Sequence, residues 1–298
     1  MTRPTAAHRP AAVRRAARVV IAVAMAAAVV PATAAPSVAG RGGTAMPQAI
    51  TGHGVHALFG SENRTMPTQR REVALTFNAA WETEGLDTVL GVLRRYHAPA
   101  TFFLTGDFAD RHPEAVRAIT AAGHGIGNHS YSHPHFETLQ PGERAAEVLR
   151  ADRAIRAAGG TTSLPFFRFP YGDTTPREIA EVNALGFADI EWTTDTNGHL
   201  GPVGGMTVRK AVRRALDALR PGAIVEMHVG SDGQDTVLDA DALPQLIEAI
   251  HARGYAIADL RGLIEAPGSA EAFPSGLRSG QAPSGTITVA MAATALPL

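Results

Sequence analysis

The sequence predicts an α/β protein built on a parallel β-sheet. Short apolar runs of strand length recur along the chain, segments with helical spacing separate them, and glycine or proline marks most of their ends. Strands that alternate with helices pair in parallel, so the pattern indicates a sheet of about seven strands. Over about 190 residues, such a sheet either closes into a slightly short barrel or stays open and doubly wound.

The first half of the sheet is predicted between residues 72 and 127. The apolar run 73–77 is typical of a buried strand. The segment 86–96 carries apolar residues at helical spacing, and 100–104 is the next apolar strand. A helix over 113–122 has proline in its first turn and glycine just past its end. A short strand at 125–127 then leads to a pair of histidines.

The second half of the sheet follows the same alternation. The long helix 141–158 ends at two glycines, and Pro170 stops the strand 166–169. The helix 176–185 ends before Gly186, which precedes a strand at 188–193. The last predicted elements are a helix at 207–219, a strand at 223–227, a helix at 240–253 that ends before a glycine, and a strand at 256–260.

The two ends of the chain are predicted to lie outside this domain. Residues 1–35 read as a signal peptide, because arginines precede a twelve-residue apolar run and a small-x-small cleavage motif at Ala32-Thr33-Ala34. The run is too short to span a bilayer comfortably, although an uncleaved anchor is the alternative. We expect a secreted, extracytoplasmic protein, associated with the cell wall, without a stable membrane span. The predicted segments are a signal peptide at 1–35, a linker and N-terminal domain edge at 36–71, the domain at 72–265 and a low-complexity tail at 266–298.

Composition excludes several classes of function. The formal net charge is −1, so the sequence predicts no nucleic-acid partner. The chain has no cysteine, which excludes disulfides, thiolate metal sites and a cysteine nucleophile. Any metal ion must therefore be held by histidine, aspartate, glutamate or water.

Polar side chains follow six successive predicted strands. Because the carboxyl ends of parallel strands meet at one edge of the sheet, these side chains should gather there and form a metal-assisted hydrolytic site. Two of them, His129 and His133, would share one face of a helical turn and could hold zinc, although ordinary surface histidines have the same spacing. The residues are Asn78, Asp107, His129 with His133, Arg168 with Tyr171, Asp195, and His228.

The order of these motifs resembles the polysaccharide deacetylases with a NodB-homology domain, carbohydrate esterase family four. The resemblance covers roughly residues 70–262 and implies a deformed (β/α) barrel. It also implies a divalent metal, zinc or alternatively cobalt, and removal of N-acetyl or O-acetyl groups from peptidoglycan, chitin-like oligomers or xylan. The motifs are Thr76-Phe77-Asn78, His129-Ser130-Tyr131-Ser132-His133, Arg168-Phe169-Pro170-Tyr171-Gly172, Trp192-Thr193-Thr194-Asp195 and Val225-Glu226-Met227-His228.

The resemblance assigns the metal and oxyanion sites to four residues. His129 and His133 would be the metal ligands. Arg168 would orient the group at the position of the catalytic base, which is occupied here by Asn78. The backbone N–H of Tyr171 would stabilise the oxyanion.

The resemblance also assigns the general acid. His228 would protonate the leaving amine, and Asp195 would hold its imidazole in the required tautomer and raise its pKa. Trp192 is compatible with lining the acyl pocket, and equally with a place in the core.

The first motif departs from the family pattern. The family has Thr-Phe-Asp-Asp-Gly there, with the first aspartate as base and the second as metal ligand, whereas this chain has Asn78 and Ala79. An amide cannot accept the proton at neutral pH, and alanine cannot ligate a metal. Either Glu82 or Asp107 replaces the missing carboxylate, or zinc makes the attacking water acidic enough to need only weak help. Glu82 is otherwise an ordinary acid at a helix N-terminus, and Asp107 a cap at a strand end.

Three functions remain open from the sequence. The first is a secreted metal-dependent deacetylase of cell-wall or related polysaccharides. The second is a catalytically impaired carbohydrate-binding protein on the same fold, which the loss of both aspartates favours. The third is hydrolysis of a small amide that is not a sugar.

Overall fold

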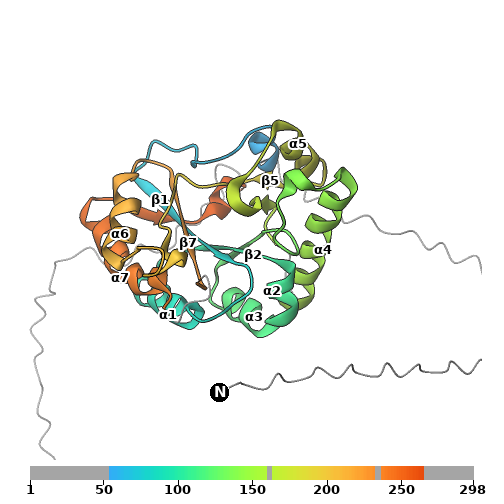
Figure 1. Ribbon diagram of the computed structural model, residues 1–298. Coiled ribbons are helices and arrows are strands. Elements are labelled where there is room, and N and C mark those ends of the chain that lie inside the picture. Colours follow the sequence, from blue (N-terminus) through green and yellow to red (C-terminus); the bar gives the residue numbers. More distant parts are fainter. Residues whose placement is uncertain (1–53, 160–162, 232–235, 265–298) are drawn as a thin grey trace, which may run out of the picture. The chain divides into compact units, whose positions relative to one another are not determined.

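The computed structural model describes residues 54–159, 163–231 and 236–264. The predicted signal peptide and tail lie outside these ranges. The described residues form one parallel sheet surrounded by helices (Figure 1). The strands are β1 Glu72–Ala79, β2 Thr101–Leu104, β3 Gly125–Asn128, β4 Phe166–Phe167, β5 Ala188–Asp189, β6 Thr194–Asp195, β7 Ala223–His228 and β8 Ala256–Ala258. The α-helices are α1 Leu86–Tyr96, α2 Gly106–Arg111, α3 Pro113–Ala121, α4 Pro141–Gly159, α5 Pro176–Ala184, α6 Val208–Asp217 and α7 Leu238–Ala252.

The sheet curls into the expected deformed barrel. Its strand order is β5-β4-β3-β2-β1-β7-β6, with β8 paired to β1, and all pairs are parallel. The strands β5 and β6 form opposite ends of this order, yet only four residues separate them in sequence. The chain therefore crosses from one end of the sheet to the other between them, which brings the two ends together.

This crossing corrects the predicted strand 188–193. The backbone N–H of Ile190 still donates to Phe167 on β4, but that of Thr193 donates to Ile224 on β7. The segment changes its partner strand midway, so it forms two short strands instead of one. The loss of regular pairing also shortens the predicted strand 166–169 to Phe166–Phe167.

The segment before β1 covers the gap between the two ends of the sheet. Asn63 forms a parallel bridge with Ile190, and its side-chain amide donates to the carbonyl oxygens of Leu58 and Asp189, both at 2.8 Å. Val55 and Leu58, on the 3₁₀ helix Val55–Leu58, are buried. The part of the predicted linker that the structure describes is therefore an integral edge of the domain.

The strands separate an outer apolar core from the barrel interior. On β1, Val73, Leu75 and Phe77 pack in the core that includes the buried face of α1. Ala74 belongs to the interior cluster, so Thr76 and Asn78, which alternate with the outer residues, also point inward. On β7, the interior residue Ile224 places Glu226 and His228 on the same inner face. The polar residues of the site thus lie inside the barrel, near the carboxyl ends of its strands.

The helix α2 is an element that the sequence pattern did not predict. It begins after Thr105, whose hydroxyl accepts a hydrogen bond from the Phe108 N–H at 3.0 Å. The helix is only six residues long, too short for a recognisable apolar periodicity. Within the described ranges, no helix is long and apolar enough to cross a membrane.

Candidate active site

Register between neighbouring strands brings the inward-facing polar residues together. Asn78 on β1 is the register partner of His228 on β7, and Glu226 on β7 is the partner of Asp195 on β6. Residues that pair across a parallel sheet point to the same face. These four side chains, contributed by three adjacent strands, therefore face one interior.

A strained loop, and not a helical turn, presents the two histidines. His129 follows β3, and the ring centroids of His129 and His133 lie 4.8 Å apart at 78°. Ser130 and His133 have φ values of 66° and 59°, in the left-handed region that non-glycine residues rarely adopt. Asn128 accepts the Ser130 N–H and the Ser130 hydroxyl accepts the His133 N–H, both at 3.0 Å. The prediction that a helical turn brings the two histidines together was wrong, but the loop does hold them side by side. Backbone strain of this kind is concentrated at functional sites.

The imidazoles of this pair fit a divalent cation. The Nδ1 atom of His129 contacts the backbone oxygen of Arg168 at 2.9 Å, an arrangement typical of metal-binding histidines. Its buried Nε2 atom and the buried Nδ1 atom of His133 have no hydrogen-bond partner among the described residues. Burial lowers the pKa of His129 well below its ordinary value and lowers the pKa of His133 to about 4. Both rings are therefore neutral at pH 7, as metal ligands must be.

A buried arginine fixes the side chain of Asn78. Arg168 is fully buried, and its Nη1 atom donates to Oδ1 of Asn78 and to Oγ1 of Thr76, each at 3.0 Å. This is the contact expected of a residue that orients position 78. Burial lowers the pKa of the Arg168 guanidinium, which nearby carboxylates partly offset.

A carboxyl group lies on the other side of Asn78. The Nδ2 atom of Asn78 donates to Oε1 of Glu226 at 2.6 Å, and the same oxygen lies 3.8 Å from Nη1 of Arg168. Burial raises the pKa of Glu226 to about 8, although Arg168 and His228 favour its charged form. Glu226 was not singled out from the sequence. A charged residue inside the apolar run of β7, two positions before the histidine, was the available signal.

The two carboxylates considered from the sequence do not contact Asn78. Asp107 lies in the first turn of α2 and pairs with Arg111, one turn further along the helix. Glu82 is exposed and lies before α1, near Gly230. Within the described ranges, neither carboxylate forms a hydrogen bond with Asn78. Glu226 is therefore the carboxyl group that contacts position 78.

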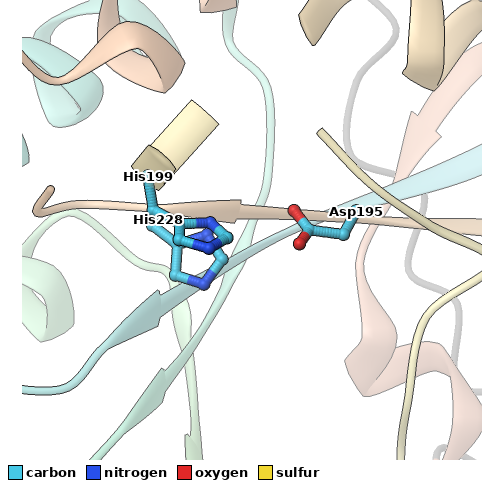
Figure 2. Close-up of side chains that lie close together, drawn as sticks. All are labelled: Asp195, His199 and His228. Atoms are coloured by element: carbon cyan, nitrogen blue, oxygen red, sulfur yellow. The ribbon is translucent and has the colours of Figure 1, made fainter. Parts of the chain in front are cut away.

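Two carboxylates, rather than one, surround the imidazole of His228. Asp239, in the first turn of α7, accepts the His228 backbone N–H at 2.9 Å and lies 3.8 Å from its Nδ1 atom. Asp195 and His199 also place ligand-type atoms within 4.8 Å of His228 and of each other, and Figure 2 shows the Asp195 carboxylate pointing toward the two rings. The predicted Asp195 is thus close, and Asp239 is a partner that sequence reasoning missed.

The charges around His228 favour its protonated form. Burial opposes that form, but the contact with Asp239 and the charges of Glu226 and Asp195 outweigh burial and raise the pKa of His228 to about 9. A protonated imidazole cannot ligate a metal, because both its nitrogens carry protons. The group of Asp195, His199 and His228 is therefore suited to proton transfer, whereas the neutral pair at 129 and 133 is suited to metal binding.

Exposed aromatic side chains flank the metal-binding pair. Tyr171 and Trp81 are 52% and 41% exposed, and their rings lie 4.6 Å and 5.3 Å from that of His133 between centroids. Tyr171 has a φ of 63°, and its backbone N–H has no acceptor among the described residues, so it is available to an oxyanion. Trp192 is half-buried and packs against Gly172, where any side chain would collide with the indole.

Comparisons with known proteins place the chain among polysaccharide deacetylases. The family model for polysaccharide deacetylase matches residues 65–190. The chain is 35% identical over 196 residues to a chitooligosaccharide deacetylase of Bradyrhizobium sp. (strain ANU 289), covering 63% of this chain and 88% of that protein. It is 28% identical to a peptidoglycan-N-acetylglucosamine deacetylase of Bacillus cereus, covering 67% of this chain and 70% of that protein.

Solved structures show the same fold. A CE4 family pseudoenzyme from Bacillus anthracis has a TM-score of 0.61 at 28% identity, covering 68% of each chain. A mutant of that pseudoenzyme with restored enzymatic activity has a TM-score of 0.60 at 28% identity, covering 68% of this chain and 70% of that one. The matched structures thus include a pseudoenzyme and a reactivated variant of it.

Proposed function

This chain belongs to the polysaccharide deacetylase family, and we propose that it hydrolyses the N-acetyl groups of an acetylated polysaccharide with a divalent metal ion bound by His129 and His133. The proposal rests on three groups of side chains that lie together at the carboxyl ends of the strands. These are two neutral imidazoles with free buried nitrogens, the Arg168–Asn78 pair, and a protonated His228.

His129 and His133, which would hold the metal, and the backbone N–H of Tyr171 would bind the acetyl group. When bound, a divalent cation polarises the carbonyl and acidifies the attacking water. The backbone N–H of Tyr171 donates to the oxygen that becomes negative as water adds. The left-handed conformation of Tyr171 is the strained feature that directs this N–H away from the regular backbone pattern.

His228 supplies the proton to the leaving group. Its raised pKa, about 9, keeps the imidazolium populated at neutral pH. Asp239 and Asp195 stabilise that charge and hold the ring on the inner face of β7. General acid help of this kind contributes about 10²–10⁴-fold to a rate.

The rim around His133 suits a sugar polymer. Trp81 and Tyr171 present exposed rings that gather around His133, and exposed apolar side chains that cluster in this way are typical of ligand sites. Relatives are named for chitooligosaccharides and for peptidoglycan N-acetylglucosamine, so oligomers of N-acetylglucosamine are the first substrate to test. We propose zinc as the metal, with cobalt as the alternative.

One assay tests the function. Acetate release from N-acetylglucosamine oligomers and from peptidoglycan is measured for the parent and for His228→Ala, with and without zinc. We expect metal-dependent release by the parent and a loss of about 10²–10⁴-fold in the variant. Equal release by the two proteins, or none by the parent, would reject the proposal.

A second candidate is a carbohydrate-binding protein without catalysis. Asn78 and Ala79 favour it, because they replace a base and a metal ligand of the family pattern. It predicts binding of the same oligomers, measured by calorimetry, without acetate release.

We also propose that the chain is exported. A signal peptide at residues 1–35 predicts that N-terminal sequencing of extracytoplasmic material begins near Ala35 or Pro36. Recovery of intact Met1 or Thr2 on membrane-bound material would indicate an anchor.

A further inference from the structure

A carboxyl group occupies the neighbourhood of the missing base. Glu226 is 2% exposed and is the acidic residue of strand β7, in which the other residues before His228 are apolar. Its Oε1 atom lies 2.6 Å from Nδ2 of Asn78. Because an amide and a carboxylate have the same shape, an aspartate at position 78 would place an oxygen where Nδ2 now lies. The Glu226 oxygen is thus one hydrogen-bond length from the position of the expected base atom.

We propose that Glu226 is the general base of this protein, supplied by the strand next to the one that carries Asn78. The proposal rests on the proposed deacetylation and names the residue that the first motif lacks. Asn78 then holds the base in position, because Arg168 fixes Oδ1 of the amide at 3.0 Å and so directs Nδ2 at Glu226.

With Glu226 as the general base, every proton in the reaction has a donor and an acceptor. Its carboxylate takes a proton from water as the water oxygen bonds to the acetyl carbon. The Tyr171 N–H stabilises the resulting oxyanion. Collapse of this intermediate breaks the carbon–nitrogen bond while His228 gives its proton to the nitrogen, so acetate and a free amine are formed. Glu226 then loses its proton and His228 regains one, and the net reaction consumes one water.

The spacing of the two groups suits a substrate between them. Glu226 and His228 are two residues apart on one strand and share its inner face. Their α-carbons are therefore separated by about 6.6 Å along the strand. His228 is the register partner of Asn78, whereas Glu226 is the partner of Thr76. The proposed acid therefore lies two residues nearer the carboxyl end of the strand than the proposed base.

The surrounding charges predict the pH range in which Glu226 can act. Burial raises its pKa to about 8, Arg168 and His228 lower it, and Asp195 and Glu191 raise it. Because the base must be ionised and His228 must be protonated, activity should rise with pH toward about 8 and fall above about 9. Glu226 and His228 interact electrostatically. The apparent pKa values read from the two limbs of the profile therefore describe the pair and not either residue alone.

A purely structural role for Glu226 makes different predictions. Glu226 could serve only to balance the buried charge of Arg168, whose Nη1 atom lies 3.8 Å away. Loss of the carboxylate would then lower stability or disturb position 78. It would not set the acidic limb of the rate profile, so the activity that remains in Glu226→Gln would keep the acidic limb of the parent.

A reciprocal exchange of the carboxylate separates these roles. The kcat/KM of acetate release from N-acetylglucosamine oligomers is measured from about pH 6 to about pH 10. Variants are Glu226→Gln, Glu226→Leu and the double variant Asn78→Asp with Glu226→Leu. The single variants should lose about 10²–10⁴-fold. The double variant should recover at least tenfold over Glu226→Leu, with its acidic limb at lower pH, because Arg168 lowers the pKa of an aspartate at 78.

Controls keep the result specific. Glu82→Gln and Asp107→Asn remove the two carboxylates that do not contact Asn78, and both should retain the parent rate. Zinc uptake by Glu226→Gln should match the parent, and its thermal unfolding should show a single folded state. If Glu226→Gln does not fold, the double variant still tests whether the carboxylate can move between the strands.

The outcomes distinguish this proposal from the proposed function. Full activity of Glu226→Gln, with activity lost in His228→Ala, would remove Glu226 as the base and leave the deacetylase intact. If the parent is inactive and only the double variant releases acetate, Glu226 does not act as the general base. An inactive parent with an inactive double variant would reject deacetylation itself.

Discussion

Asp239 contacts His228 twice, once through the backbone and once through the imidazole. Its Oδ2 atom accepts the His228 N–H at 2.9 Å and lies 3.8 Å from Nδ1, while Oδ1 accepts the Thr196 hydroxyl at 2.6 Å. The carboxylate lies against Gly198, where any side chain would collide with it. Asp239 also lies in the first turn of α7, where the helix dipole favours a negative charge. These contacts hold the Asp239 side chain beside the proposed acid.

Replacement of Asp239 should therefore weaken His228 as an acid at high pH. Asp239→Asn keeps the shape but removes the charge that raises the pKa of His228. The alkaline limb of kcat/KM should move down by about 1–3 pH units, with a smaller change at the acidic limb. Asp241→Asn is the matched control, because Asp241 lies in the same helical turn but is exposed. An unchanged alkaline limb in Asp239→Asn would contradict the positioning role.

Metal uptake should depend on the pair His129 and His133. His129→Ala removes one of two neutral imidazoles, and the remaining single nitrogen should not retain zinc measurably in calorimetry. The control is His135→Ala, which alters the exposed group of His135, Glu137 and Asp173 that also gathers possible ligands. Uptake lost in the His135 variant and kept in the His129 variant would place the metal at the exposed group.

The sequence predicts the fold where local patterns decide it. The helix 86–96 has the predicted bounds, because its four buried apolar residues mark one face. The prediction of one strand over 188–193 was wrong, because Ile190 pairs with β4 whereas Thr193 pairs with β7. That exchange depends on contacts between β5, β6 and distant strands, which periodicity does not contain.

The candidate site divides in the same way. The contact of Arg168 with Asn78 and the proximity of His129 to His133 follow from the motif order. Glu226 could not be placed beside Asn78, because the contact depends on the register of β1 against β7, 148 residues apart in sequence. Asp239 looked like any acid at the start of a helix, and its role depends on how α7 packs against β7.

The buried carboxyl groups of Asp189 and Glu191 should make the stability of the fold depend on pH. Burial raises the pKa of Asp189 well above its ordinary value, and the nearby Glu191 adds to the shift. The native state therefore binds more protons than the unfolded state, so stability falls as pH rises from about 4 toward the folded pKa. Asp189→Asn should lose less thermal stability than the parent between about pH 5 and about pH 8.

Thermal unfolding monitored by circular dichroism at those two pH values checks the expectation. The exposed Asp241→Asn should behave like the parent. An equal pH-dependent loss in Asp189→Asn and in the parent would show that Asp189 is already ionised in the folded protein at about pH 5.

Asn78→Asp alone should change the pH dependence of the rate more than its maximum. The new carboxylate would lie within hydrogen-bond distance of Glu226, and two adjacent carboxyl groups hold one proton between them. Arg168 would favour the charge at position 78, so the pair should ionise once at a lower pH than Glu226 does alone. We expect the rate at about pH 7 to rise roughly tenfold and the rate near pH 9 to change little, because one pKa unit corresponds to a tenfold change in the ionised fraction.

Acetate release at these two pH values, measured beside the parent, separates three cases. A gain at low pH alone agrees with a base already present in the parent. A gain on the order of 10²-fold at both pH values would mean that the parent lacks a base and that Asn78→Asp creates one. Release at the level of buffer for both proteins, with oligosaccharide binding retained, would identify a binding protein, because the acid, the oxyanion donor and a carboxylate would then be present without catalysis.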